Sequence, residues 1–431
     1  MTSNAQPYSS LNAQGAANEL DDLKVRYEAI KAKGLSLDMS RGKPSPAQLD
    51  ISTPMLSILR NASDCFSEDG IDCRNYGVID GIPEAKRMMA HLLDDKPENV
   101  IVFGNSSLTV MHDAIARCLD FGCLGSEPWA ARDSVKFICP VPGYDRHFTI
   151  LQQFGIEMLT VPMTEDGPNM DEVERICATD DSVKGIWCVP KYANPTGITY
   201  SDEVVRRLAS MDCAASDFRI FWDNAYCVHD LYPQNDMKDR LLDIAHACIE
   251  SGNPNRYFKF ASTSKITFPG AGISAMASSP ENISEAKKLV NAQMIGADKL
   301  NQLRHVRFIE DEAALERHMN ALADIIRPKF ELVWERLEEE LSDLNIASWT
   351  KPRGGYFVSF DGLPNTAKRT VQLAKDAGVV LTSAGATYPF GDDPDDSNIR
   401  IAPTMPTLEE LDAALDVFCL CVKIAALETM I

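Results

Sequence analysis

Lys265 is the first residue in this sequence whose setting suggests chemistry. It lies in STSKITFPGAG, directly after the apolar run YFKFA, which the pattern predicts to be a buried strand. An amine held in a partly dry pocket at a strand end has a lowered pKa and can attack a carbonyl group. Most Ser-Lys pairs lie in solvated loops, so this segment alone leaves both interpretations open.

Two more polar side chains follow predicted strands. Asp223 ends the run RIFWD in FWDNAY, and Asn194 follows KGIWCV in PKYANPTG. A carboxylate at a strand end can pair with a protonated ring nitrogen, although a helix-capping aspartate has the same sequence setting. The Asn194 amide can donate to a phenolate oxygen, and an ordinary Asn-Pro turn explains the same residues.

The segment VFGNSSLTVMHDAI runs from a predicted strand through a small polar turn into a predicted helix. Free backbone N–H groups at the helix start, together with the Ser106 and Ser107 hydroxyls, suit a phosphate. Simple serine capping of the helix is the alternative.

These residues need a frame that brings strand ends together. Short apolar runs alternate with amphipathic helical stretches from about residue 83, which predicts a mostly parallel sheet covered on both faces. Ligands bind at the carboxyl ends of the strands in such sheets. We expect an N-terminal segment and helix that belong to the small domain (1–60), a large domain (61–305) and a small α+β C-terminal domain (306–431).

The composition narrows the function. The formal net charge of -21 disfavours nucleic acid and anionic membranes as partners, and no apolar run is long enough to span a bilayer. Twelve scattered cysteines without a CxxC pair favour reduced, buried thiols in a cytoplasmic protein and give no metal site. The N-terminus does not read as a signal peptide.

Together, NPTG, DxAY and SxSK occur in the order and spacing of the class I aminotransferases of pyridoxal-phosphate fold type I, which the chain resembles from about Gly42 to about Pro403. The segments SRGKP, GNSSL, PGYDRH and IGADKLNQLRH look like a divergent bacterial branch of aspartate aminotransferases. The resemblance implies pyridoxal 5'-phosphate as cofactor. It also implies an α/β fold whose large domain holds a mostly parallel seven-stranded sheet.

Catalytic roles follow from the resemblance, residue by residue. Lys265 matches the lysine that holds the cofactor as an aldimine and moves the proton between Cα and the cofactor carbon. Asp223 matches the partner of the pyridine nitrogen. Asn194 and Tyr226 match the pair that hydrogen-bonds the phenolate oxygen, and Tyr144 matches the ring stacked on the pyridine.

The remaining cofactor residues are implied in the same way. Ser106, Ser107 and Ser262 resemble phosphate ligands. His147 resembles a histidine that supports the aspartate, although an ordinary turn histidine stays open. Tyr76 resembles a tyrosine that reaches the phosphate of the partner subunit, so the resemblance implies a homodimer with shared active sites.

Substrate binding is expected at Arg400, which resembles the arginine that grips the α-carboxylate, and at Gly42 and Asn194 in the same pocket. A dicarboxylic substrate needs a second cation, because a buried unpaired carboxylate is costly. Its candidates are Lys299, Arg41 and, less favoured, Arg304, all of which could instead be structural or solvent-facing.

One position departs from the family. The arginine expected eight residues after the lysine is Ile273, so the phosphate must use another cation or rely on backbone and hydroxyl donors.

The function expected is ping-pong transfer of the amino group of L-aspartate to 2-oxoglutarate. The alternatives are an aromatic, kynurenine or alanine aminotransferase, a β-lyase or decarboxylase on the same fold, and a non-catalytic sensor. A sensor that regulates transcription would carry an N-terminal DNA-binding domain, and here the helical pattern begins at about Glu19.

Overall fold

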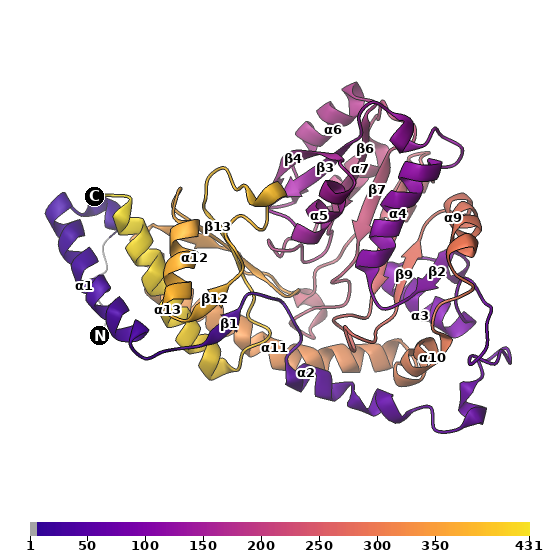
Figure 1. Ribbon diagram of the computed structural model, residues 1–431, viewed down its shortest axis with the longest axis horizontal. Helices are drawn as coiled ribbons and strands as arrows, with labels where there is room; N and C mark the ends of the chain where they lie inside the picture. The colour runs from indigo at the N-terminus through magenta and orange to yellow at the C-terminus, as the bar shows by residue number, and fades with distance from the viewer. Residues whose placement is uncertain (1–6) are drawn as a thin grey trace.

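Eight strands form one sheet in the computed structural model, which describes residues 7–431 (Figure 1). Their order across the sheet is β2-β9-β8-β7-β6-β3-β4-β5, and the four pairs from β8 to β4 are parallel. The strands are β2 (Val100–Phe103), β3 (Lys136–Val141), β4 (Glu157–Thr164), β5 (Gly167–Pro168), β6 (Val183–Cys188), β7 (Arg219–Asp223), β8 (Tyr257–Ser262) and β9 (Ser274–Ala277). The predicted fold class is confirmed, and the two-residue β5 adds an eighth strand to the seven expected.

The strands β2, β6 and β7 are buried on both faces and consist mostly of apolar residues, as expected for a sheet covered by helices on both sides. Along β2, Ile101 and Phe103 pack with α4, whereas Val100 and Val102 pack on the opposite face with α3. The helices of the first face are α4 (Ser107–Phe121), α5 (Asp145–Gln153) and α9 (Pro280–Gln293). Those of the second face are α3 (Pro83–Leu93), α6 (Met170–Thr179), α7 (Asp202–Ser210), α8 (Ile244–Glu250) and α10 (Lys299–Phe308).

A second group of elements has its own apolar core. It holds an antiparallel sheet in the order β10-β11-β13 and the parallel pair β1-β12. Its strands are β1 (Leu37–Met39), β10 (Ala347–Trp349), β11 (Val358–Gly362), β12 (Val379–Leu381) and β13 (Asn398–Ile401), and its helices are α1 (Ala13–Lys31), α12 (Ala367–Asp376) and α13 (Leu408–Glu428). The helix α1 lies against α13 (Figure 1), so the N-terminal segment joins the C-terminal core. The domain boundaries at residues 60 and 305 stay a prediction.

The turn-rich segment LDMSRGKPSP, residues 37–46, contains one strand that its sequence does not predict. Its first residues form β1, which pairs with β12 in register Leu37 to Val379. The short helix α2 (Pro46–Ile51) follows, with Ser45 and Gln48 forming a capping box. A three-residue strand gives no periodic signal, so only its distant partner reveals it.

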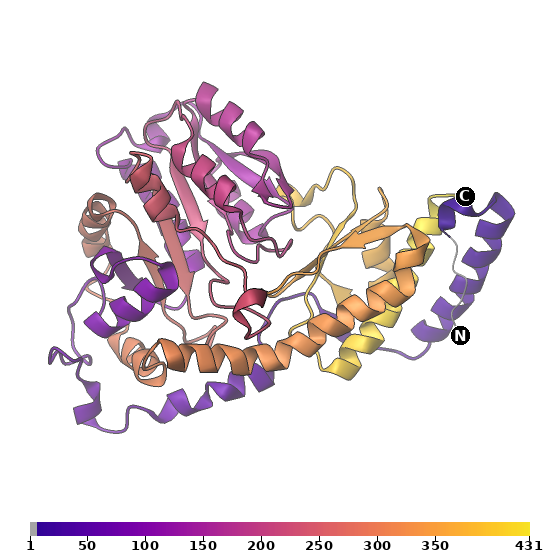
Figure 2. The same ribbon diagram turned by 180° about the vertical axis from the view of Figure 1, so that it is seen from behind.

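The helix α11 (Glu312–Leu341) links the two cores. Its first part, with Leu315, Met319 and Leu322, belongs to the core beside α3 and α10, and its second part, from Ile326 and Phe330, belongs to the core of α13. Figure 2 shows this helix running from the large sheet to the smaller one. Pro328 lies inside it, where a proline removes one helical hydrogen bond.

Candidate active site

The structure brings the predicted catalytic residues together where β6, β7 and β8 end. Lys265 follows β8, and its Nζ lies 4.7 Å from the centre of the Tyr226 ring and 6.0 Å from that of Tyr356. Burial lowers the pKa of Lys265, the negative charge of Asp223 opposes this, and the positive charge of Arg400 adds to it. An amine in this setting gives up its proton more readily than a lysine in water.

Asp223 is the last residue of β7 and is almost fully buried. Its Oδ2 lies 2.9 Å from Nε2 of His147, whose ring stacks on Trp187 at 4.2 Å between centroids. Its Oδ1 is buried and has no hydrogen-bond partner among residues 7–431. A buried, unpartnered carboxylate oxygen is unfavourable by itself, so the position suits a donor supplied by a ligand.

Arg400 comes from β13 of the smaller sheet and reaches the same place. Its Nη1 donates to Oδ1 of Asn194 at 3.1 Å and to Oδ1 of Asp145 at 3.0 Å. Its guanidinium lies over the ring of Phe357, 4.8 Å from the centroid. The side chain is buried, and its Nε has no partner among the described residues. A carboxylate could therefore accept two hydrogen bonds from the guanidinium, one of them from Nε.

Gly42 packs against Phe357, the ring over which the Arg400 guanidinium lies. A Cβ at Gly42 would lie 2.5 Å from the Phe357 ring, so a larger residue would displace the ring that supports Arg400. This contact explains why the turn after β1 matters to the site.

Both predicted tyrosines, Tyr144 and Tyr226, lie near enough to Asp223 to feel its negative charge. The Tyr144 ring meets His147 edge-on at 4.9 Å, just before α5 begins. Burial raises the pKa of Tyr144 and of Tyr226, and nearby negative charge raises both further. Both side chains therefore stay phenols that can donate a hydrogen bond.

The small polar turn before α4 has open donors. Ser106 is the N-cap residue of α4, yet its side chain caps no backbone N–H. Ser262 donates to Oγ of Ser264 at 3.0 Å, and Ser264 donates to the carbonyl of Asn105 at 3.3 Å. Hydroxyls from the end of β8 thus reach the turn before α4, where Ser107 opens the helix and the free backbone N–H groups favour an anion.

Ile273, where the family has an arginine, is buried and donates its backbone N–H to Oγ1 of Thr263 at 3.0 Å. The same hydroxyl lies 3.1 Å from Nε2 of His305. An apolar contact and a hydroxyl network therefore occupy this position.

Among the residues that the structure describes, no hydrogen bond or ion pair joins Lys265 to any of the three candidates for the second cation. Lys299 is buried, and its Nζ donates to the carbonyl of Gly77 at 2.9 Å beside a cavity of about 470 Å³ that Tyr76 also lines. Arg304 donates to Oδ1 of Asn301, and Arg41 is exposed. Tyr76 itself is 83% exposed.

Some site residues escape sequence reasoning. Asp145, Phe357 and Trp187 contact Arg400 or His147 through pairings far apart in the chain. Only Asp145 had a signal, since it follows Tyr144 directly. His229 also contacts the lysine segment, with Nε2 3.3 Å from the Lys265 carbonyl, and burial followed by the Lys265 charge lowers its pKa to about 3.

Residues 7–431 contain no cluster of three or more metal-ligating side chains. No helix in the same range combines the length and apolar character needed to cross a membrane.

The fold and the gathered residues define an aminotransferase of the pyridoxal-phosphate fold type I class. The sequence matches the family described as aspartate amino-transferase over residues 11–431, and the chain belongs to that family. It is 50% identical to a protein of Mycolicibacterium smegmatis named provisionally as an aminotransferase, over 94% of each chain. It is 45% identical to an aspartate aminotransferase of Corynebacterium glutamicum, over 95% of this chain and 94% of that one. The crystal structure of an aspartate transaminase from C. glutamicum superposes with a TM-score of 0.94 at 43% identity, over 98% of both chains.

Proposed function

We propose that this aminotransferase uses pyridoxal 5'-phosphate to transfer the amino group of L-aspartate to 2-oxoglutarate by a ping-pong route. The observation that carries the proposal is the free Oδ1 of Asp223, which is buried at the strand ends close to the Lys265 amine. A protonated pyridine nitrogen is the donor that this oxygen lacks.

The residues fit the cofactor at each of its polar groups. Asp223 would hold the ring nitrogen, Asn194 and Tyr226 the phenolate oxygen, and the start of α4 with Ser262 the phosphate. Bound there, the cofactor supplies an electron sink for the charge that forms when a substrate Cα loses its proton.

The protein's own contribution is to hold and move protons. Lys265 has a lowered pKa, so as a free amine it can accept the Cα proton and return it to a neighbouring carbon. Its amine lies over the Tyr226 ring. Asp223, which His147 contacts at 2.9 Å, would hold the ring nitrogen of the bound cofactor in its protonated form.

Arg400 supports the α-carboxylate site, since its fork is buried and one nitrogen is unpaired. The preference for aspartate draws on the names of the C. glutamicum relatives. Lys299 and Arg41 are the proposed contacts of the distal carboxylate. The exposed Tyr76 lines the same cavity as Lys299, and a partner subunit could cover both residues. The proposed distal-carboxylate site would therefore be completed in a homodimer. A cytoplasmic location stays a prediction.

An amino-donor panel tests the proposal. Purified protein with bound cofactor is mixed with aspartate, alanine, kynurenine or an aromatic amino acid, and the absorbance of the bound cofactor is followed through the first half-reaction. Aspartate should react fastest, and a faster reaction with another donor would reject the substrate assignment alone. Lys265→Ala should still bind the cofactor and lose about ten-thousandfold or more in rate. Wild-type turnover by that variant would reject the whole proposal.

A further inference from the structure

A second cavity lies at the opposite end of the sheet, beyond the amino ends of β7 and β8. It has a volume of about 570 Å³ and contains none of the proposed active-site residues. Its walls come from the loop after α4, the segment before β7 and the turn before β8, at Cys123–Ser126, Ala215–Arg219 and Gly252–Arg256.

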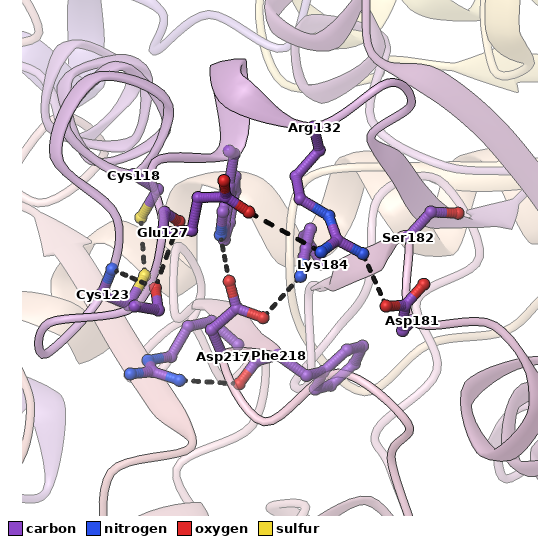
Figure 3. A network of polar contacts seen from close by, with 12 residues as sticks. Cys118, Cys123, Glu127, Arg132, Asp181, Ser182, Lys184, Asp217 and Phe218 are labelled. Atoms are coloured by element: carbon purple, nitrogen blue, oxygen red, sulfur yellow. Dashed lines mark hydrogen bonds and ion pairs between the residues drawn. The ribbon is translucent and has the colours of Figure 1, made fainter.

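Two cysteines meet at the wall of this cavity. Cys118 lies in the last turn of α4 and Cys123 follows the end of that helix, and their sulfur atoms are 3.3 Å apart (Figure 3). Both side chains are more than nine-tenths buried, and Cys123 lines the cavity.

The backbone fixes this pair. Gly122 has a φ of +73°, and a Cβ there would lie 2.2 Å from the carbonyl oxygen of Ser126. The turn is held further by the Ser126 hydroxyl, which accepts from the Cys123 N–H at 2.9 Å. Only glycine fits at position 122, and its backbone conformation turns the chain so that Cys123 packs against the end of α4.

Arg219 adds a positive charge beside the sulfurs. It is 4% exposed, its Nη1 donates to the Phe218 carbonyl at 3.0 Å, and its Nε has no partner in the described chain. The hydrogen bond with Cys118 lowers the pKa of the Cys123 thiol, and the Arg219 charge lowers it too, whereas burial and the charges of Asp217 and Glu285 oppose this. Burial raises the pKa of Cys118. Cys123 lines the 570 Å³ cavity and Cys118 does not, so an oxidant that enters the cavity meets the Cys123 sulfur first.

We propose that Cys118 and Cys123 form a dithiol site that hydrogen peroxide oxidises to a disulfide, with Cys123 as the attacking thiol. The Cys123 sulfur attacks one peroxide oxygen, the O–O bond breaks, and water leaves with the second oxygen, which gives a sulfenic acid. The Cys118 sulfur then attacks the Cys123 sulfur, the S–O bond breaks, and a second water leaves. In sum, two thiols and one peroxide give one disulfide and two waters. The sulfurs must approach from 3.3 Å to about 2 Å.

A second cysteine pair is the natural competitor. Cys213 also lines the cavity, and its hydrogen bond with Cys177 lowers the pKa of Cys213 and raises that of Cys177. Cys177 lies in α6 and Cys213 in the segment before β7, so a bond between them would join two separate elements. The Cys118–Cys123 bond closes within one turn.

Peptide mapping tests the site without measuring transamination, so its outcome is independent of the proposed function. Full-length protein with pyridoxal phosphate is treated with a small excess of hydrogen peroxide, alkylated and digested without reductant. We expect a Cys118–Cys123 crosslink that dithiothreitol reverses. Peroxide that oxidises other cysteines and leaves these two as thiols would overturn the proposal.

Variants separate the two roles. Cys118→Ala should leave a sulfenic acid on Cys123 that dimedone traps, whereas the wild type should trap little. Cys123→Ala should slow thiol loss at Cys118 about tenfold. Cys65→Ser, at a half-buried cysteine elsewhere, should behave as wild type. Equal dimedone labelling of Cys123 in wild type and Cys118→Ala would contradict the sequence of steps. If either alanine variant does not fold, the wild-type crosslink decides alone.

Discussion

Two buried aspartates lie at opposite ends of β7 and differ in one respect. At the amino end, Oδ1 of Asp217 accepts from Nζ of Lys184 at 2.6 Å and Oδ2 accepts from Nε1 of Trp129 at 2.9 Å (Figure 3). At the carboxyl end, Oδ2 of Asp223 lies 2.9 Å from His147, and Oδ1 has no partner among the described residues.

The difference separates a structural carboxylate from a functional one. Asp217 and Lys184 satisfy each other, so their removal from water is compensated and nothing remains to bind a ligand. Burying Oδ1 of Asp223 without a partner costs free energy. A hydrogen-bond donor on a bound ligand would offset that cost. Burial and residue type are the same in both places, and the partners alone distinguish them.

Breaking the closed pair should have the largest effect, and on stability. Asp217→Asn leaves the Lys184 ammonium buried without a counter-charge and should reduce the free energy of unfolding by about 3–5 kcal/mol. Urea unfolding followed by circular dichroism measures the loss, and kcat should be unchanged. The double variant Asp217→Asn with Lys184→Met should regain part of it. A drop in kcat without a loss of stability would erase the distinction.

Breaking the open carboxylate should act on catalysis instead. Asp223→Asn cannot hold a proton on the ring nitrogen, so kcat should fall roughly a hundred- to a thousandfold. Stability without substrate should change little, because only the His147 contact is altered. Steady-state kinetics and urea unfolding of the same preparation test both statements. Strong destabilisation with normal kcat would place Asp223 in the class of Asp217.

The contact between His147 and Asp223 should have a smaller effect. His147→Phe keeps a ring against Trp187 but removes the hydrogen bond to the carboxylate, which should reduce kcat about ten- to a hundredfold. His147→Gln, which can still donate, should recover part of the rate. An unchanged kcat in the phenylalanine variant would show that the aspartate needs no support.

The smallest effect is expected at Asp145, which occupies Arg400 before a substrate does. Its side chain is about one-third exposed, so the pair contributes little, and Asp145→Asn should lower KM for the amino acid about two- to fivefold. Arg400→Lys, the matched change on the other partner, should raise KM. A raised KM in Asp145→Asn would mean that Asp145 positions the arginine for substrate.

The sequence predicts the residues at strand ends well because a parallel sheet collects them at one edge. Lys265, Asp223 and Asn194 each follow an apolar run that became a strand, and the family resemblance assigned their roles. The contacts of Arg400 with Asp145 and Phe357 join segments from different sheets, and no local pattern encodes such pairs.

Short elements cannot be predicted from the sequence for the same reason, since their partners are distant in the chain. The strand β1 is three residues long and is held by β12, more than three hundred residues later. Whether both carboxylate oxygens of a buried aspartate have partners also depends on residues distant in the chain, and so no sequence pattern marks Asp217.

The proline inside α11 has a mechanical consequence. Pro328 has no N–H to give, so the carbonyl of Asp324 lacks its usual helical donor at the point where the helix leaves one apolar core and enters the other. A helix that lacks one backbone hydrogen bond bends most easily at that position. Any movement of β13, which carries Arg400, relative to β8, which precedes Lys265, would therefore bend α11 most easily at this point.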